Sequence, residues 1–315
     1  MKAKDLRIII VGFGSIGERH YRNLKALGCK NVSVYDIDKK KTRNHKSEVK
    51  NLSKNILRNF NVAFICNPTN KHMETALQCA EAGLHLFIEK PLSHKLKGVA
   101  KLEALCRKKR LINMVACNMR FHSALQFAKR YIALGKLGKI YSISHEFGHF
   151  LPYWRPGTDY RKNYAAHKKM GGGIVLDDIH EFDLLFWLNN FSPFVRSYIL
   201  YNKSSDLKID TPDQAKAMFH FRNNVLGSVS CDYLSKRYHR QFFIVGKKGN
   251  LYWDFEENIV WHESEKGRSK LLVIESYDLN TMYLEEVKYF LKSLAKKKKT
   301  FNDVKTAKTL LKHLL

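Results

Sequence analysis

Three glycines near the start of the chain have the spacing of a phosphate-binding turn. Gly12, Gly14 and Gly17 form a G-x-G-x-x-G motif directly after a run of β-branched residues. In such a unit the first glycine makes a tight turn, the second lets a pyrophosphate approach the backbone, and the third lets a helix pack closely on the strand. Ser15 and Ile16 begin that helix, where free backbone N–H groups meet the anion. The motif therefore predicts a dinucleotide site.

A carboxylate stands where the adenosine ribose of a dinucleotide is expected. Asp36 lies 19 residues after Gly17, at the end of the next predicted strand, 32–35. A carboxylate there binds the ribose hydroxyls and repels a 2′-phosphate, which favours NAD. The lysine run at 39–41 leaves NADP open, because one of these cations could bind that phosphate.

A lysine follows another predicted strand, 86–88, in the sequence Glu89-Lys90-Pro91. Ligands of open α/β sheets bind at the carboxyl ends of the parallel strands, and proline restricts the turn. Lys90 is therefore a candidate for ligand contact. The alternative is a loop lysine that meets only solvent.

An aspartate and a histidine could do acid–base chemistry from one helix. A helix is expected over 174–189, and at about 100° per residue Asp177 and His180 lie about 60° apart on it. Asp178 lies about 200° from His180 and is expected to point away, while Glu181 is a rival for the same face. The alternative is an aspartate that stabilises the helix dipole beside a histidine satisfied in the core.

The first part of the chain supplies a scaffold for these residues. Short apolar runs alternate with helical segments, which is typical of βαβ units and a parallel sheet. The lysine-rich segment up to about residue 50 is too short for a full helix-plus-strand unit, so this edge of the sheet is expected to be trimmed. Strands are expected at 6–11, 32–35, 61–66, 86–88 and 111–116, and helices up to about 27 and over 51–59, 71–82 and 95–108.

After about residue 120 the pattern changes. Consecutive long strands joined by Gly and Asn turns argue for an antiparallel sheet. The expected elements are a helix at 123–134, a strand at 139–149, an aromatic loop at 151–169, the helix at 174–189, three or four long strands between 194 and 262, and a helix at 281–296. The fold class is therefore α/β, with a parallel sheet followed by a mostly antiparallel one.

Together these motifs resemble the Gfo/Idh/MocA oxidoreductases over nearly the whole chain. The resemblance rests on Gly12-x-Gly14-x-x-Gly17, Asn67-Pro68-Thr69-x-x-His72, Glu89-Lys90-Pro91, Asn118-Met119-Arg120-Phe121, Gly135-Lys136-Leu137-Gly138, and Gly171-Gly172-Gly173 before an Asp/His pair. It implies a doubly wound Rossmann domain over 1–120. An α/β domain over 121–315 with an open, mostly antiparallel sheet would bind substrate and mediate oligomerisation.

The resemblance also implies roles for individual residues. Lys90 would lie beside the nicotinamide ribose and the substrate hydroxyl, with His180 as general base and Asp177 orienting it or binding a neighbouring hydroxyl. The Asp177–His180 spacing is one residue shorter than the family's usual one. The expected cofactor-binding residues are Gly12, Gly14, Ser15, Ile16, Gly17, Asp36, Asn67, Pro68, Thr69, His72, Glu89 and Lys90.

The aromatic loop before the triple glycine is similar to a sub-branch associated with surface sugars and nucleotide sugars. Tryptophan and tyrosine platforms with arginine suit a sugar ring and an anionic group. Arg120, Trp154, Tyr160 and Arg161 are therefore expected to bind substrate. The alternative is a packed aromatic loop without a ligand.

Composition excludes several other classes of protein. The formal net charge of +27 suggests nucleic acid, but the lysines are spread along the chain and no recognition motif accompanies them. No apolar run is long enough to span a bilayer, and the cysteines form no C-x-x-C pair, so a cytoplasmic protein is expected. His145 and His149 lie on a predicted strand without further ligands, so no metal site is expected.

The sequence thus predicts an NAD(P)-dependent oxidoreductase that transfers a hydride between nicotinamide and a carbinol carbon of a sugar or sugar derivative, including a nucleotide sugar. One alternative is a non-catalytic dinucleotide-binding regulator, and another is a redox-neutral enzyme with tightly bound NAD. The partners expected are a small sugar-type substrate and further copies of the chain, as a homodimer or homotetramer, with no nucleic acid and no membrane. A helical pattern runs to Leu315, so a further short segment could follow.

Overall fold

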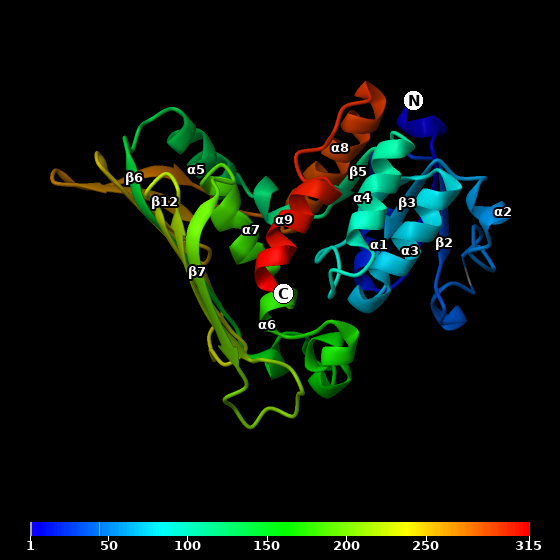
Figure 1. The fold of residues 1–315 in the computed structure, drawn as a ribbon, viewed down its shortest axis with the longest axis horizontal. Coiled ribbons are helices and arrows are strands. Elements are labelled where there is room, and N and C mark those ends of the chain that lie inside the picture. Colours follow the sequence, from blue (N-terminus) through cyan, green and yellow to red (C-terminus); the bar gives the residue numbers. More distant parts are fainter. Residues whose placement is uncertain (1, 44) are drawn as a thin grey trace. The chain divides into compact units, whose positions relative to one another are not determined.

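The computed structural model describes residues 2–43 and 45–315, which form two compact units. Unit 1 contains the chain up to Asn118 together with Met282–Leu315, and unit 2 contains Met119–Thr281 (Figure 1). Within the described part of the chain, no helix combines the length and the apolar character needed to cross a lipid bilayer.

Unit 1 is built on a five-stranded parallel sheet of order β2-β1-β3-β4-β5. Its central strands are almost completely buried, because helices pack around them and leave no solvent-facing side. The strands are β1 Arg7–Val11, β2 Asn31–Tyr35, β3 Val62–Ile65, β4 His85–Ile88 and β5 Asn113–Val115. The helices are α1 Ser15–Ala26, α2 Lys54–Leu57, α3 Thr69–Ala82, α4 Val99–Lys108, α8 Asn280–Lys296 and α9 Val304–Leu314.

The β2 edge of this sheet is trimmed, as the sequence predicted. In the described residues, β2 pairs with β1 on one side and meets only the isolated bridge between Val34 and Glu48 on the other. Between them the lysine run folds as a short 3-10 helix, Lys39–Lys41, after Asp38. Asp36 directly follows β2 at this trimmed edge and is buried.

The C-terminal helices belong to unit 1, whereas the sequence placed them in the second domain. The reason is the open edge of β5, whose backbone groups need partners. The backbone N–H of Val115 donates to the carbonyl of Asn302 at 2.8 Å, and the side-chain amide of Asn302 returns a bond to the carbonyl of Val115 at 2.9 Å. The hydroxyl of Thr300 donates to the carbonyl of Asn113 at 2.6 Å. Residues 282–315 thus close the edge of the first sheet.

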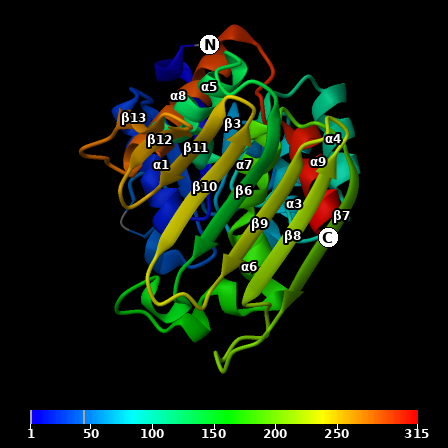
Figure 2. The same ribbon diagram turned by 90° about the vertical axis from the view of Figure 1, so that its left-hand side faces the viewer.

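Unit 2 contains an eight-stranded sheet of order β13-β12-β11-β10-β6-β9-β8-β7, in which only β6 and β9 pair in parallel (Figure 2). Its strands are β6 Ile140–Gly148, β7 Phe194–Asn202, β8 Gln214–Phe221, β9 Leu226–Asp232, β10 His239–Gly246, β11 Gly249–Asp254, β12 Ile259–Ser264 and β13 Gly267–Val273. The expectation of three or four strands after residue 194 was wrong. Two-residue turns such as Lys247–Lys248 divide the segment into shorter strands. The mostly antiparallel sheet itself is confirmed.

One face of this sheet is covered by helices. They are α5 Ser123–Ala133, α6 Ile174–Asp177 and α7 Ile179–Leu188. Along β8 the side chains of Ala215, Ala217 and Phe219 are buried, while the intervening Lys216 and Met218 are exposed. This alternation shows that the strand has a core face and a solvent face.

Candidate active site

The glycine motif forms a cradle that protein packing explains only in part. A Cβ at Gly12, where φ is +95°, would lie 2.3 Å from the backbone nitrogen of Asn67, and one at Gly17 would lie 2.0 Å from the carbonyl oxygen of Gly12. The fold therefore requires both glycines. A Cβ at Gly14 would meet nothing within 4 Å, so the fold does not require a glycine there. Open space at the N-terminus of α1 fits a dinucleotide pyrophosphate.

Asp36 is held in place at the end of β2. Its Oδ2 accepts the backbone N–H of Phe13 at 2.7 Å, and its Oδ1 accepts that of Asp38 at 2.9 Å. A carboxylate has further lone pairs, so it can still accept ribose hydroxyls. The ammonium of Lys41 lies 3.9 Å from Oδ2. The residues present fit NAD.

Glu89 is bonded within the protein, which differs from the expected cofactor contact. Its Oε1 lies 2.6 Å from Nε2 of His20 on α1, and both side chains are buried. Burial acts to raise the pKa of Glu89, but His20, Lys90 and His72 outweigh it, so the pKa lies below its usual value. This carboxylate therefore ties the loop before Lys90 to the helix of the glycine motif.

His72 joins two of the motifs rather than facing open space. Its Nδ1 lies 2.8 Å from the carbonyl oxygen of Pro91, and its Nε2 lies 2.8 Å from the carbonyl oxygen of Asn67. The side-chain amide of Asn67 donates to the hydroxyl of Thr75 at 2.8 Å. Pro68 and Thr69 begin α3. These motif residues fix the loops at the carboxyl edge of the sheet.

The three expected catalytic residues come from different units. Lys90 follows β4 in unit 1, at the carboxyl edge of the parallel sheet. Asp177 and His180 belong to α6 and α7 in unit 2, and His180 is buried.

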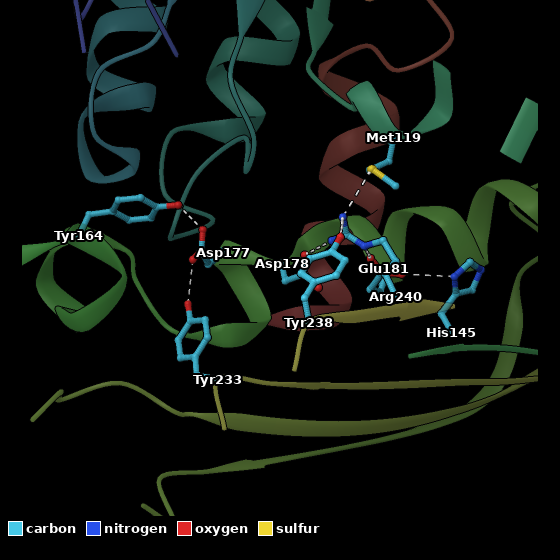
Figure 3. Close-up of polar contacts among 9 residues, drawn as sticks. All are labelled: Met119, His145, Tyr164, Asp177, Asp178, Glu181, Tyr233, Tyr238 and Arg240. Carbon is cyan, nitrogen blue, oxygen red and sulfur yellow. Dashed lines mark hydrogen bonds and ion pairs between the residues drawn. The ribbon is translucent and has the colours of Figure 1, made fainter. Parts of the chain in front are cut away.

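The helix carrying Asp177 and His180 is interrupted, and this corrects the expectation of one continuous helix. α6 ends at Asp177 and α7 begins at Ile179, because Asp178 has φ −107° and ψ 41°. The angles calculated from a continuous helix therefore do not apply. Figure 3 shows Asp177 and Asp178 directed to different partners.

Asp177 accepts hydrogen bonds from two tyrosine hydroxyls. One is Tyr164 of the aromatic loop, and the other is Tyr233, at 2.9 Å, which directly follows β9 (Figure 3). Burial, and then the charge of Asp177, raise the pKa of Tyr233 well above its usual value, so this tyrosine remains a donor. Asp177 is thus a carboxylate oriented by two tyrosine hydroxyl donors.

Asp178 and Glu181 share one buried arginine (Figure 3). Nη2 of Arg240 on β10 donates to Oδ1 of Asp178 at 2.8 Å, and its Nε donates to Oε1 of Glu181 at 2.8 Å. The second oxygen of Glu181 lies 3.3 Å from Nδ1 of His145. Glu181 is therefore an anchor rather than a rival to Asp177. Because Asp178 and Glu181 flank His180 in the chain, Arg240 ties the start of α7 to the sheet.

Models of one protein family match both parts of the chain. Residues 6–117 match the Gfo/Idh/MocA model described as an oxidoreductase family with an NAD-binding Rossmann fold, and residues 125–252 match the Gfo/Idh/MocA C-terminal domain. The chain belongs to the Gfo/Idh/MocA oxidoreductase family. The family resemblance, the Rossmann fold and NAD as cofactor, all expected from the motifs, are confirmed.

Similar members of the family act on cyclic polyols and sugars. Myo-inositol 2-dehydrogenase of Thermotoga maritima is 27% identical over 310 residues, which cover 92% of this chain and 88% of that protein. Levoglucosan dehydrogenase of Pseudarthrobacter phenanthrenivorans is 26% identical over 62% of this chain and 56% of its own. The structure of UDP-N-acetylglucosamine 3-dehydrogenase from Acidithiobacillus ferrooxidans has a TM-score of 0.81 at 18% identity, covering 98% of this chain and 95% of that one, and shows the shared fold.

In this Gfo/Idh/MocA member His149 lies near Asp177. From the sequence alone, His149 is a candidate only for metal binding. His149 follows β6 and is 4% exposed, yet neither ring nitrogen has a hydrogen-bond partner among the described residues. Its ring centroid lies 4.3 Å from that of Trp154 and 5.2 Å from that of Tyr233. Burial lowers the pKa of His149 to about 4, although the charge of Asp177 acts against this. In the sequence, His149 stands at the end of a predicted strand and just before the aromatic loop, and this position is the signal that could have indicated a functional residue.

The other residues expected to bind substrate have different surroundings in the structure. Trp154 is partly exposed and stacks on Tyr238, with centroids 6.2 Å apart. Tyr160 accepts the backbone N–H of Lys208 at 3.2 Å through its hydroxyl. The exposed Arg161 pairs with Asp159.

Arg120 differs most from the expectation. It is 1% exposed, and its guanidinium makes two bonds to the carboxylate of Asp183, with Nε to Oδ2 at 2.7 Å and Nη2 to Oδ1 at 2.5 Å. This geometry gives Arg120 a role in holding α7, and its contact with substrate stays a prediction. Among the residues described, no group of three His, Cys, Asp or Glu side chains is arranged to hold a metal ion.

Proposed function

We propose that this NAD-dependent oxidoreductase oxidises a secondary hydroxyl of a cyclic polyol or sugar, free or joined to a nucleotide. The observation that carries the proposal is His149, whose two buried ring nitrogens have no partner in the described chain and lie beside Trp154. A buried polar group without a partner is costly. The hydroxyls of such a ligand are the kind of partner that His149 lacks within the described chain, and the apolar face of a sugar ring suits the indole of Trp154. The polyol and sugar relatives support this substrate class.

In the proposed mechanism His180 accepts the proton of the reacting hydroxyl, because a neutral imidazole suits general-base work near neutral pH. Lys90 donates a hydrogen bond to the same oxygen and stabilises the alkoxide that develops on it. Asp177, oriented by Tyr164 and Tyr233, binds a neighbouring hydroxyl or orients His180. NAD, when bound, supplies the hydride acceptor.

The test is NADH formation with myo-inositol, levoglucosan and UDP-N-acetylglucosamine as candidate substrates. For the one that is oxidised, His180→Ala and Lys90→Ala should each lower kcat by about a hundredfold or more, because each removes a group that acts in the transition state. NADH binding, measured by calorimetry, should persist in both variants. The exposed Lys95, five residues after Lys90, provides the control Lys95→Ala. Near-normal turnover of His180→Ala would refute the proton-transfer role.

The proposal extends to the state of the enzyme in the cell. A homodimer or homotetramer is supported by large apolar side chains on the solvent face and edge of the unit 2 sheet, among them Tyr198, Leu200 and Met218 at 68%, 75% and 63% exposed. Light scattering after size exclusion would measure the mass, and a monomer would refute this part.

A cytoplasmic location is supported by the cysteines of the described chain, which are buried and form no disulfide.

A further inference from the structure

A second pocket lies in unit 1, at the edge of the parallel sheet opposite to the glycine motif. It has a volume of about 350 Å³ and is lined by residues of 103–113 and 297–305. These segments include the end of α4, the start of β5 and the start of α9, all labelled in Figure 1. Dinucleotides bind at the carboxyl ends of the strands, whereas Asn113 is at the amino end of β5. This pocket is therefore separate from the cofactor site.

The fold brings two basic runs together around the pocket. One is 107–110, which spans the end of α4, and the other is 296–299, which spans the end of α8. Each basic run by itself is typical of a solvated surface. In the structure, five cationic side chains line the same pocket: Arg107, Arg110, Lys297, Lys299 and Lys305.

Two of these five cations, Arg107 and Lys305, act on the nearby Glu103 and help Lys308 to lower its pKa, but none of the five is held by a direct contact in the described part of the chain. None of their side chains makes a hydrogen bond or an ion pair within residues 2–43 and 45–315. Two acidic residues also line the pocket, but both are engaged. Glu103 pairs with Lys308 at 2.7 Å, and Asp303 caps α9 by accepting the backbone N–H of Thr306 at 2.9 Å. The pocket lining thus holds five cations against two carboxylates, an excess of positive charge.

The backbone at two of these cations is also unusual. Arg110 and Lys297 have φ of 53° and 51°; Arg110 lies two residues after the end of α4, and Lys297 directly follows α8. Glycine is the residue usually found in this left-handed conformation after a helix. Residues in such conformations concentrate at ligand sites. The competing explanation is that these cations only complement the negative ends of the two helices, and that explanation requires no ligand.

The floor of the pocket is apolar. Cys106, Leu111 and Val304 line the pocket together with the charged residues and are buried at 4%, 8% and 1% exposure, so we take them as its floor. An apolar floor, a few polar groups at the rim and a volume of several hundred Å³ are typical of small-molecule sites. Arginine forks match phosphate oxygens in pairs, and lysines add point charges.

From this arrangement we propose that the pocket binds an oligophosphate, either free or as the tail of a nucleotide whose ring rests on the apolar floor. The inference does not depend on the substrate proposed above. It predicts that an oligophosphate binds to the protein already saturated with NADH, without displacing that cofactor.

The test uses neighbouring residues of the same two runs as matched variants. Arg107→Gln with Lys299→Gln removes two cations from the pocket. Lys108→Gln with Lys298→Gln removes two exposed cations that do not line it. Calorimetry on the full chain with saturating NADH would measure binding of tripolyphosphate, ADP and inorganic phosphate. The pocket variant should bind tripolyphosphate at least about tenfold more weakly than wild type, and the control variant should match wild type.

The outcomes separate the explanations. Tighter binding of ADP than of tripolyphosphate identifies a nucleotide site, and equal or weaker binding of ADP identifies a site for the phosphates alone. The proposal is overturned if wild type binds none of the three ligands, or if both variants lose affinity equally, as a diffuse basic surface predicts. Binding of duplex DNA but not of tripolyphosphate would also overturn it. Equal thermal midpoints of the two variants would show that both are folded.

Discussion

At the level of single residues, neighbouring acids in unit 2 have separate duties. Asp177 accepts hydrogen bonds from two tyrosine hydroxyls, whereas Asp178 pairs with the buried guanidinium of Arg240. A buried carboxylate paired with arginine is costly to disturb. The pairing with Arg240 gives Asp178 a structural role, and the part of Asp177 in the chemistry stays a prediction.

His149 supplies a prediction at the same scale. With a pKa of about 4 it is neutral at assay pH, so it can offer a hydrogen bond but no charge. His149→Phe keeps an aromatic ring beside Trp154 and should raise KM for the polyol about tenfold, with a smaller effect on kcat. The pH profile of kcat between pH 6 and 8 should keep its shape, since the lost group does not titrate there.

Two further variants test which nitrogen of His149 acts. The amide of Asn can replace Nδ1 and that of Gln can replace Nε2, so one of them should restore part of the affinity that Phe loses. If Phe, Asn and Gln all leave KM unchanged, His149 does not contact substrate, although the oxidoreductase assignment would stand.

At the level of the elements, the break between α6 and α7 lies next to Arg240, which bonds to Asp178 in the break and to Glu181 on α7. Removing one partner of a buried ion cluster leaves uncompensated charge, so Arg240→Met should lower the free energy of unfolding by about 3–5 kcal/mol. Arg237 offers a matched control, because it pairs with Glu256 at the surface with 84% of its side chain exposed. Arg237→Met should cost less than about 1 kcal/mol. Urea unfolding measures both, and equal losses would contradict an anchoring role for the cluster.

The same break shows what the sequence could and could not predict. The strand–turn–helix start of unit 1, Asp36 and the strand-end Lys90 follow from local patterns, and the structure has the elements that carry them. Asp178, where the helix is interrupted, bonds to Arg240, 62 residues away, and no local pattern reports that contact. The buried pairing of Glu89 with His20, 69 residues apart, was missed for the same reason.

Considered as a whole molecule, the chain leaves unit 1, forms all of unit 2 and returns to complete unit 1. The return is part of the core: the ring of Phe290 on α8 packs against Phe64 and Phe87, with centroids 5.9 and 5.4 Å away. A cut after residue 118 would therefore expose these two rings and the edge of β5. Unit 2 is continuous over 119–281 and needs no such return.

This organisation predicts how fragments behave. The fragment 119–281 should unfold cooperatively by itself, because its sheet and covering helices are all present. The fragment 1–118 should lack a cooperative transition and bind NADH weakly. Joining 1–118 to 282–315 through a flexible Gly/Ser linker should restore both properties, since linker length adds little to the cost of closing the loop. Thermal unfolding and NADH calorimetry of the three fragments provide the test. A fragment 1–118 that binds NADH as tightly as the joined form would show that the C-terminal helices are an addition to the Rossmann core and not a part of it.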